Sequence, residues 1–387
     1  MKTLRSGRNR RKWIYVLLLM GLLGLSGCGS PSSASVEMSS QTELVKTGSM
    51  ELQYAENFAV DYYEDGYKML TTLPDSKRYL LVPEGQPVPK GLDEDVSILQ
   101  EPLQNIYLVA SGVMDMFASV DAVDQIRFSG QKQENWYIQT AKDAMAAGDM
   151  IYAGKYSKPD YELLVSEGCD LAIENRMITH SPEVVEMLQS FDIPVMIEYS
   201  SYEQHPLGKV EWVKFFGALT GKEAEAEEAF AEQTEILEKV ESGEKTGKTI
   251  AFFYVTSNGL IQVRQSTDYI PKLIELAGGR YIFENLEDSG SGRSTLNMQV
   301  EDFYAGAKDA DILIYNSSID GGVTTVDELI GKCNILKDFK AVQEGQVYCT
   351  TNDMYQQSMA IGYLLQDMHT VLTDDDTAKL RYLFLLQ

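Results

Sequence analysis

The pattern that most constrains the fold of this chain is a series of short apolar segments, each followed by a helical segment. In the first series the apolar segments lie at residues 106–110, 126–128, 150–153, 171–173 and 194–197. In a second series they lie at residues 250–255, 261–263, 312–315 and 346–349, and the first two of these are expected to form a hairpin. Continuous apolar strands that alternate with helices are typical of a parallel sheet covered on both faces. The sequence therefore predicts two α/β lobes.

A long amphipathic helix is predicted between the two series. The stretch from Pro206 to about Val240 is mostly helical and is interrupted at Gly221. The apolar residues of its second half, Lys222–Val240, fall on one stripe between many glutamates. At 1.5 Å per residue this helix is about 30 Å long, enough to cross between two domains. The predicted fold is α/β, with two Rossmann-like lobes, each a mainly parallel sheet with flanking helices, joined by one long α-helix.

The N-terminus has the features of a secretory leader. Residues 1–12 carry six cations and no acid, and the apolar segment Trp13–Leu25 follows them. This segment is short of the ~20 residues that a permanent spanning helix needs, but it fits a signal peptide. It ends in Leu25-Ser26-Gly27-Cys28, which resembles a bacterial lipobox and implies cleavage before Cys28 and a lipid on its thiol. The alternative is a type II membrane anchor with an incidental cysteine.

These segments divide the chain into five parts. We expect a lipoprotein signal peptide at 1–27, a flexible tether at 28–50, an N-terminal α/β lobe at 51–205, a helical linker with the inter-lobe helix at 206–243 and a C-terminal α/β lobe at 244–387. The tether is rich in serine and poor in large apolar residues. Alternating patterns at Phe58–Tyr63 and Tyr79–Val82 predict two strands that form a hairpin at one sheet edge.

Charge and cysteine content restrict the partners of the chain. The net charge is −25, and loss of the six cations of the leader brings it to about −31. An acidic surface repels phosphate backbones, so we expect no nucleic-acid partner and contact with the membrane through the N-terminal lipid only. Cys169, Cys333 and Cys349 are an odd number of cysteines after the leader, which argues against a disulfide framework. Whether Cys333 pairs with Cys349 stays open. The three histidines have no metal-ligand spacing, so no protein-ligated metal and no cofactor are expected.

One local motif occurs once in each predicted lobe. Pro159–Leu164 places a glutamate on a helix ahead of Gly168–Ile173, and Val300–Phe303 does the same ahead of Asp309–Ile314. The two glutamates are 139 residues apart. With the two-lobe layout, the motif resembles the class III solute-binding proteins that serve ABC importers of iron-siderophores, haem and vitamin B12. The resemblance covers roughly residues 100–387.

The resemblance implies a function and partners. It implies an extracytoplasmic, lipid-anchored component at the cell membrane that captures a small-molecule metal chelate and delivers it to an ABC permease dimer with its ATPase. An iron-siderophore is favoured over haem, and haem over a corrinoid. It also implies that Glu162 and Glu301 dock with arginines of the permease, since a carboxylate can accept two parallel bonds from a guanidinium. Ordinary solvated glutamates are the alternative.

The ligand is expected outside the carboxyl ends of the strands, as in other open α/β sheets. The candidate ligand-binding residues of the first lobe are Ser111, Lys132, Trp136, Lys155, Tyr156, Arg176, Tyr199 and Tyr202. Those of the second lobe are Tyr254, Arg264, Arg293, Tyr315, Asn352 and Tyr355. Aromatic walls with a few cations suit a flat or anionic ligand such as a metal chelate. Alternatively, some tyrosines are ordinary half-buried residues, and Arg176 pairs with Glu174 or Glu203.

Enzymatic function is not expected. The sequence has no G-x-S-x-G elbow in a strand–turn–helix context, no convincing Ser-His-Asp order and no phosphate-loop spacing. A binding protein is therefore favoured over a hydrolase. An exported ligand sensor or adhesin that uses the same fold without transport is the remaining alternative.

Overall fold

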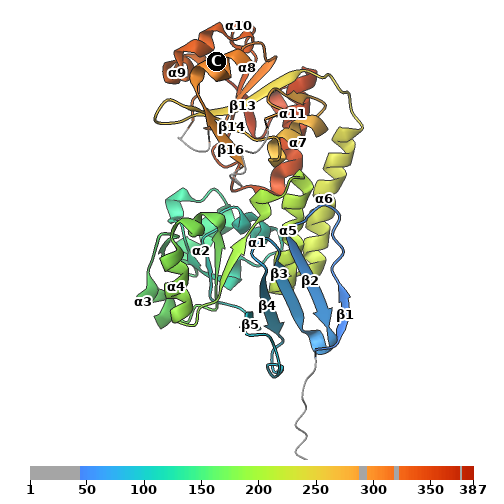
Figure 1. Ribbon diagram of the computed structural model, residues 1–387, viewed down its shortest axis with the longest axis vertical. Helices are drawn as coiled ribbons and strands as arrows, with labels where there is room; N and C mark the ends of the chain where they lie inside the picture. The colour runs from blue at the N-terminus through green and yellow to red at the C-terminus, as the bar shows by residue number, and fades with distance from the viewer. Residues whose placement is uncertain (1–43, 287–293, 318–321, 375–376) are drawn as a thin grey trace, which may run out of the picture. The chain divides into compact units, whose positions relative to one another are not determined.

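The computed structural model describes residues 44–286, 294–317, 322–374 and 377–387 of the chain. These residues form three large sheets and a two-stranded ribbon, with helices packed on the sheets (Figure 1). In this part of the chain no helix is both long and apolar enough to cross a membrane. The predicted lipid-attachment residue Cys28 and the predicted ligand residue Arg293 lie outside the described residues.

The first sheet is a five-stranded unit at the start of the described chain. Its strands, in spatial order, are β1 (Lys46–Ser49), β2 (Phe58–Tyr63), β3 (Lys68–Thr72), β4 (Lys77–Val82) and β5 (Val96–Gln100). Neighbours are antiparallel except β4 and β5, which are parallel. The predicted hairpin of β2 with β4 is wrong, because β3 pairs with both. The predicted tether also extends too far, since β1 is already paired with β2 before residue 50.

The first sheet packs on helix α5 (Pro206–Thr220). The ring of Phe58 lies 4.9 Å from that of Trp212, so one face of the sheet packs on the helix. The carboxylate of Glu211 accepts hydrogen bonds of 2.8 to 3.1 Å from the backbone N–H groups of residues 53–55. The helix thus fixes both the sheet and the chain that leads into it.

The second sheet confirms the prediction for the first alternating series. In spatial order its strands are β12 (Val195–Glu198), β11 (Leu171–Asn175), β6 (Ile106–Leu108), β7 (Ile126–Ser129) and β8 (Ile151–Tyr152). All neighbours are parallel. From β6 the chain first winds toward β8 and then returns to β11 on the other side. The strand order therefore reverses between β6 and β11, which defines a topological switch point.

Helices cover both faces of this sheet. Helix α1 (Val113–Ser119) and helix α5 pack on one face together with the side chains of Leu108 and Ile173. Helices α3 (Tyr161–Ser166) and α4 (Pro182–Ser190) pack on the other face. Helix α2 (Gln139–Ala147) and the short ribbon of β9 (Gly154–Lys155) with β10 (Lys158–Pro159) complete the lobe.

The predicted linker is a pair of packed helices. Helix α5 ends at Gly221, whose φ of 71° lies in the left-handed region that favours glycine, and α6 (Glu223–Glu241) follows. Gly217 allows the two helices to approach closely, because a Cβ at this position would come within 2.6 Å of the side chain of Ala226. The middle of α6 contacts the C-terminal lobe, where Gln233 accepts a 3.0 Å hydrogen bond from the backbone N–H of Gly362.

The third sheet has a parallel centre and antiparallel edges. In spatial order its strands are β16 (Thr295–Met298), β14 (Ile261–Arg264), β13 (Thr249–Val255), β17 (Ile312–Tyr315), β18 (Val347–Thr350) and β19 (Leu383–Leu385), with β15 (Arg280–Tyr281) also paired to β13. The three central strands β13, β17 and β18 are parallel. The predicted hairpin of β13 with β14 is confirmed. Strands β16 and β19 were not predicted. The surrounding helices are α7 (Tyr269–Leu276), α8 (Val300–Ala307), α9 (Val326–Lys332), α10 (Lys340–Gln343) and α11 (Ile361–Thr373).

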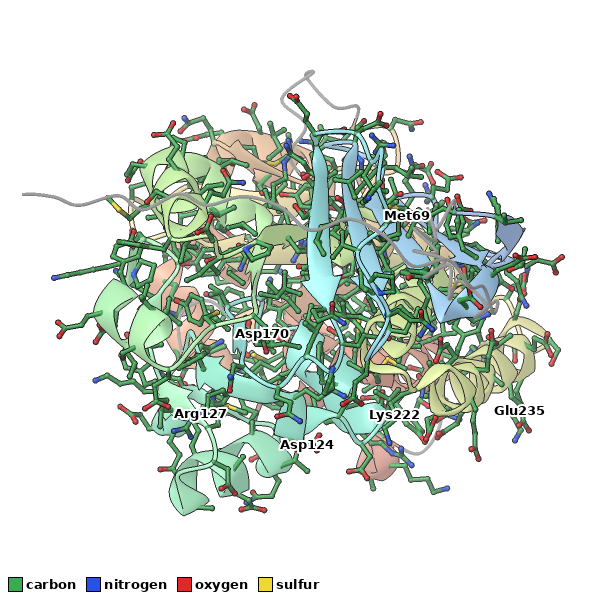
Figure 2. The ribbon with its side chains drawn as sticks, turned by 90° about the horizontal axis from the view of Figure 1, so that it is seen from below. Met69, Asp124, Arg127, Asp170, Lys222 and Glu235 are labelled. Carbon is green, nitrogen blue, oxygen red and sulfur yellow. The ribbon has the colours of Figure 1, made fainter. Side chains whose placement is uncertain are left out.

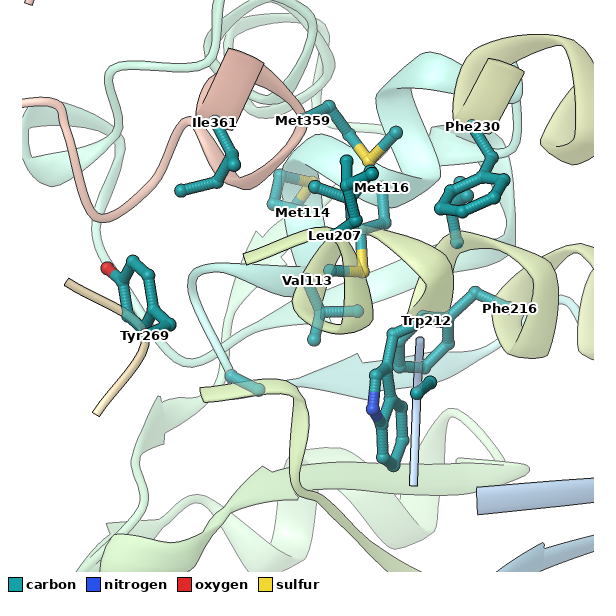
Figure 3. Close-up of a cluster of buried hydrophobic side chains, with 14 of the residues drawn as sticks. Val113, Met114, Met116, Leu207, Trp212, Phe216, Phe230, Tyr269, Met359 and Ile361 are labelled. Atoms are coloured by element: carbon teal, nitrogen blue, oxygen red, sulfur yellow. The ribbon is translucent and has the colours of Figure 1, made fainter. Parts of the chain in front are cut away.

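The largest hydrophobic core extends through both lobes. It includes Val113 of α1, Leu207 of α5, Phe230 of α6, Tyr269 of α7 and Ile361 of α11. Figure 3 shows these side chains gathered around α1 and α5. The predicted fold class, two α/β lobes joined through a long helix, is confirmed, and the junction between the lobes is itself a packed core. Cys333 is a free thiol, so it forms no disulfide with Cys349.

Candidate functional site

A cavity of about 230 Å³ lies at the carboxyl ends of β6, β11 and β12, at the switch point of the second sheet. The loops after these strands supply most of its wall, while α5 and the chain after β18 supply one residue each. The lining residues are Ala110, Ser111, Gly112, Asn175, Arg176, Met177, Glu198, Ser201, Tyr202, Lys209 and Tyr355. Because Tyr355 belongs to the C-terminal lobe, a ligand in this cavity would contact both lobes.

Four of the predicted ligand residues line this cavity: Ser111, Arg176, Tyr202 and Tyr355. The guanidinium of Arg176 lies over the ring of Tyr202, 4.6 Å from its centroid, in a cation–π contact. Glu174 and Glu203 are the two carboxylates that the sequence offers as partners of Arg176. Both carboxyl oxygens of Glu174 are buried without a hydrogen-bond partner among the described residues. The carboxylate of Glu203 accepts from the backbone of residues 56 and 57 and from Trp212.

Arg264 is not a lining residue, but it binds the lining residue Tyr355. Its Nη1 lies 3.3 Å from Asp268, and its Nη2 donates to the hydroxyl of Tyr355. Asn316 also donates to this hydroxyl, over 2.6 Å. Burial raises the pKa of Tyr355 to about 12, so the phenol stays protonated at neutral pH. Since the oxygen accepts both bonds, its own O–H can donate to a ligand.

The sequence did not predict two buried charged residues of the cavity, Glu198 and Lys209. Glu198 is 6% exposed, and its Oε2 accepts bonds of 2.8 and 2.6 Å from the backbone N–H and hydroxyl of Ser200. Lys209 is 4% exposed. Burial raises the pKa of Glu198 and lowers the pKa of Lys209. A signal for Lys209 existed in the sequence, because it is one of three charged residues in a mostly apolar helix, and charged residues are rarely buried without a specific role.

Hydrogen bonds between the lobes lie in the same region. The side-chain amide of Gln356 donates to the carbonyl of Asn135 and accepts from the N–H of Tyr137, each over 2.8 Å. Asp115 of α1 accepts a 2.7 Å bond from the N–H of Met359. Burial raises the pKa of Asp115 to about 6. The cleft is therefore bounded by direct polar contacts between the lobes.

The structure places other predicted ligand residues in the hydrophobic cores. Trp136 is 1% exposed, and its indole N–H donates over 3.0 Å to Ser129. Tyr199 is 7% exposed and packs in the largest core, while Tyr315 is fully buried in the core of the third sheet. The structure does not bring these three rings into the described lining of the cavity, although the ring of Tyr199 lies 6.4 Å from that of the lining residue Tyr202.

The remaining candidates also lie outside the described lining of the cavity. Lys132 and Lys155 are exposed on the N-terminal lobe. Tyr156 and Tyr254 are partly buried. Tyr156 packs against the hydrophobic cluster that contains Leu164 of α3, and Tyr254 packs against the cluster that contains Phe253 of β13. The side-chain oxygen of Asn352 accepts a 3.1 Å bond from Ser317.

The repeated motif has the same structure in both lobes. Glu162 and Glu301 are exposed residues in the first turns of α3 and α8. In each lobe the glutamate helix is followed by an aspartate and then by a strand, β11 in the first lobe and β17 in the second. This aspartate accepts hydrogen bonds from backbone N–H groups at or just before the beginning of the adjacent strand. Asp170 accepts 3.0 and 2.9 Å bonds from the N–H groups of residues 104 and 105, ahead of β6. Asp311 accepts a 2.7 Å bond from the N–H of Thr249, at the start of β13.

A second cavity, of about 650 Å³, lies at the opposite end of the second sheet, beside the start of β7. Its charged lining residues include Asp121, Asp124, Arg127 and Asp149, and Figure 2 labels two of them at the surface. Arg127 is already paired with Glu167 at 3.0 Å. Within the described ranges no cluster of three or more His, Cys, Asp or Glu residues could hold a metal ion. The smaller cavity is the better candidate site, because it lies at the switch point and involves both lobes.

Comparisons with known proteins agree with this geometry. The sequence model of the family described as "Periplasmic binding protein" matches residues 109–354, a range that begins after the first sheet. A protein described as an uncharacterized lipoprotein of Methanocaldococcus jannaschii is 24% identical over 396 residues, which covers 93% of this chain and 92% of the relative. A second such lipoprotein of the same organism is 23% identical over 367 residues, covering 89% and 90%.

Solved structures share the fold. A periplasmic haem-binding protein of Vibrio cholerae is similar with a TM-score of 0.55 and 14% identity, over 69% of this chain and 98% of that chain. A structure described as an ABC-type Fe³⁺-hydroxamate transport system from Saccharomonospora viridis is similar with a TM-score of 0.54 and 16% identity, over 70% and 93%. At these identities the likeness concerns the fold alone.

Proposed function

Since the chain belongs to the family of periplasmic binding proteins, which bind solutes and are not enzymes, we propose that it captures an iron chelate between its lobes and delivers it to an ABC permease. The observation that carries this proposal is the cavity at the switch point, because residues of both lobes contribute to its wall. A ligand that contacts both lobes at once is what a capture protein requires.

The lining of the cavity supports a chelate as the ligand. Arg176 and Lys209 provide positive charge, and the hydroxyls of Ser111 and Tyr355 provide hydrogen-bond donors. Two solved proteins with this fold are described as binding haem and as part of Fe³⁺-hydroxamate transport. The order of preference stays siderophore, haem, corrinoid. The described lining contains no histidine or cysteine, but Tyr202, Tyr355 and Met177 are of the kinds that ligate haem iron, so the identity of the recovered ligand decides between a siderophore and haem.

The proposal includes anchoring and docking. A lipid on Cys28 would hold the protein at the extracytoplasmic face of the cell membrane, and the similarity to proteins described as lipoproteins supports this location. Glu162 and Glu301 would dock with arginines of the paired permease subunits, since both are exposed at equivalent places in the two lobes. A sensor or adhesin would use the same cavity without a permease.

Native mass spectrometry of the protein recovered from its host's growth medium tests the ligand class. We expect a complex whose added mass contains iron. The variant Arg176→Ala should carry much less of this ligand, because it loses the cation beside Tyr202. The control Lys132→Ala should carry as much as wild type, since Lys132 lies outside the described lining. Recovery with a metal-free sugar or peptide instead would contradict the proposal.

A further inference from the structure

Lys209 is a buried ammonium group that faces the cavity. It lies in the first turn of α5, is 4% exposed and belongs to the lining. Its Nζ lies 4.7 Å from the ring centroid of Tyr269. In the described part of the chain no ion pair joins Lys209 to a carboxylate, whereas a buried charge normally has a close partner.

Other buried cations of the molecule have such partners. Lys214 lies on the same helix with the same 4% exposure, and its Nζ is 2.9 Å from Glu227 and 3.6 Å from Glu211. Arg264 is paired with Asp268. The buried Lys214 thus has carboxylates of α5 and α6 beside it. Lys209 has no carboxylate within ion-pair distance among the described residues, and it lines the cavity instead.

The carboxyl groups of Glu198, Asp115 and Asp268 interact electrostatically with Lys209, but each also binds another group. The Oε2 of Glu198 accepts both bonds from Ser200, and the Oδ2 of Asp115 accepts from the backbone of Met359. Burial lowers the pKa of Lys209, and the charges of Glu198 and Asp268, neither of which forms an ion pair with Lys209 in the described part of the chain, act in the opposite direction. Burial raises the pKa of Glu198, while the bonds from Ser200 and the charge of Lys209 act in the opposite direction.

We infer that an anionic oxygen group of the ligand completes this site, with Lys209 at its buried end and Arg176 at its more exposed side. This inference rests on the proposed function and narrows it to chelates that carry negative charge, of the carboxylate or catecholate kind. The cavity of about 230 Å³ is smaller than typical small-molecule sites of about 300–1,000 Å³. It therefore accommodates a charged group of the chelate while the body of the chelate lies outside.

Binding titrations with three probes test this inference. The probes are an anionic ferric tricatecholate, a neutral ferric trihydroxamate and metal-free citrate, each titrated by intrinsic fluorescence. The variants are Lys209→Met and Lys209→Gln, with Lys239→Met as a control because Lys239 is an exposed lysine on α6. Thermal unfolding of each variant checks that it is folded.

Wild type should bind the anionic chelate at least about 10-fold more tightly than the neutral one. Both Lys209 variants should weaken binding of the anionic chelate at least about 30-fold and leave binding of the neutral chelate unchanged. Lys239→Met should behave as wild type.

Four results would overturn one or both proposals. Equal binding of the two chelates by wild type, or undiminished binding of the anionic chelate by a folded Lys209 variant, overturns the role of Lys209 and leaves the proposed function standing. Lys209-dependent binding of citrate without binding of either chelate overturns the iron-chelate function and supports the anion site. Absence of binding to all three probes contradicts both.

Discussion

At the scale of single residues, Glu174 is a buried group without a partner. It lies in β11 and is fully buried, and neither of its carboxyl oxygens has a hydrogen-bond partner among the described residues. Burial raises its pKa from 4.5 to about 8. Because the folded-state pKa is the higher one, the stabilising contribution belongs to the protonated form. It is fully present below about pH 4.5 and is lost as the pH rises through about 8.

The variant Glu174→Gln removes this titration and keeps the shape of the side chain. Between pH 6 and 9 the free energy of unfolding of wild type should fall by about 2–3 kcal/mol relative to that of the variant. Urea unfolding at both pH values measures the difference. The control Glu186→Gln changes an exposed carboxylate of α4 and should track wild type. Parallel curves for wild type and Glu174→Gln would show that Glu174 is already ionised at pH 6.

The position of a residue at a strand end predicts its neighbourhood, but not the direction of its side chain. Ser111, Arg176 and Tyr202 follow β6, β11 and β12, and all three line the cavity. Trp136 follows β7 in the same way, but its loop folds back and buries the ring in the core. Lys209 was missed because its contacts come from residues far apart in the chain, which helical periodicity does not reveal.

At the scale of elements, α5 organises its surroundings through buried charges. The carboxylate of Glu211 is fully buried and binds the backbone of residues 53–55, while Lys214 lies 3.6 Å from it. These bonds fix the chain between β1 and β2 onto the helix. The first sheet therefore depends on one side chain of a helix that lies about 150 residues away along the chain.

The variant Glu211→Ala should lower the free energy of unfolding by about 2–4 kcal/mol, because it leaves several buried N–H groups and a buried lysine without an acceptor. Limited proteolysis should also cut first within residues 50–57. Urea unfolding measures the first effect, and mass spectrometry of the early fragments measures the second. Glu225→Ala, an exposed change on α6, should cost less than about 1 kcal/mol. A stability of Glu211→Ala within error of wild type would contradict this role of the helix.

The alternating pattern predicted the central parallel strands well, but it predicted the antiparallel strands poorly. Parallel strands such as β11 and β17 are buried on both faces and are continuously apolar, so they stand out in the sequence. Strand β3 has two threonines and a lysine among its five residues and gives no such signal. Without β3, the strands on either side of it were paired with each other, which produced the wrong hairpin.

At the scale of the whole molecule, the two lobes share one hydrophobic core, in which side chains of α1, α5, α7 and α11 pack together (Figure 3). Hydrogen bonds from Gln356 and Asp115 reinforce this junction. Because a packed core resists deformation, we expect the spacing between Glu162 and Glu301 to change little when a ligand binds. A fixed spacing would suit docking onto two permease subunits at once.

Uptake of a radiolabelled ferric chelate by host cells that carry the variant Glu162→Ala/Glu301→Ala tests capture and delivery most directly. Both glutamates are exposed and lie outside the described lining of the cavity, so the variant should bind the chelate with unchanged affinity. Its uptake rate should fall at least about 10-fold, because two arginines of the permease lose their acceptors. The control Glu225→Ala/Glu228→Ala removes two carboxylates from α6 and should transport normally. Uptake at the wild-type rate by the first variant would contradict delivery through these residues.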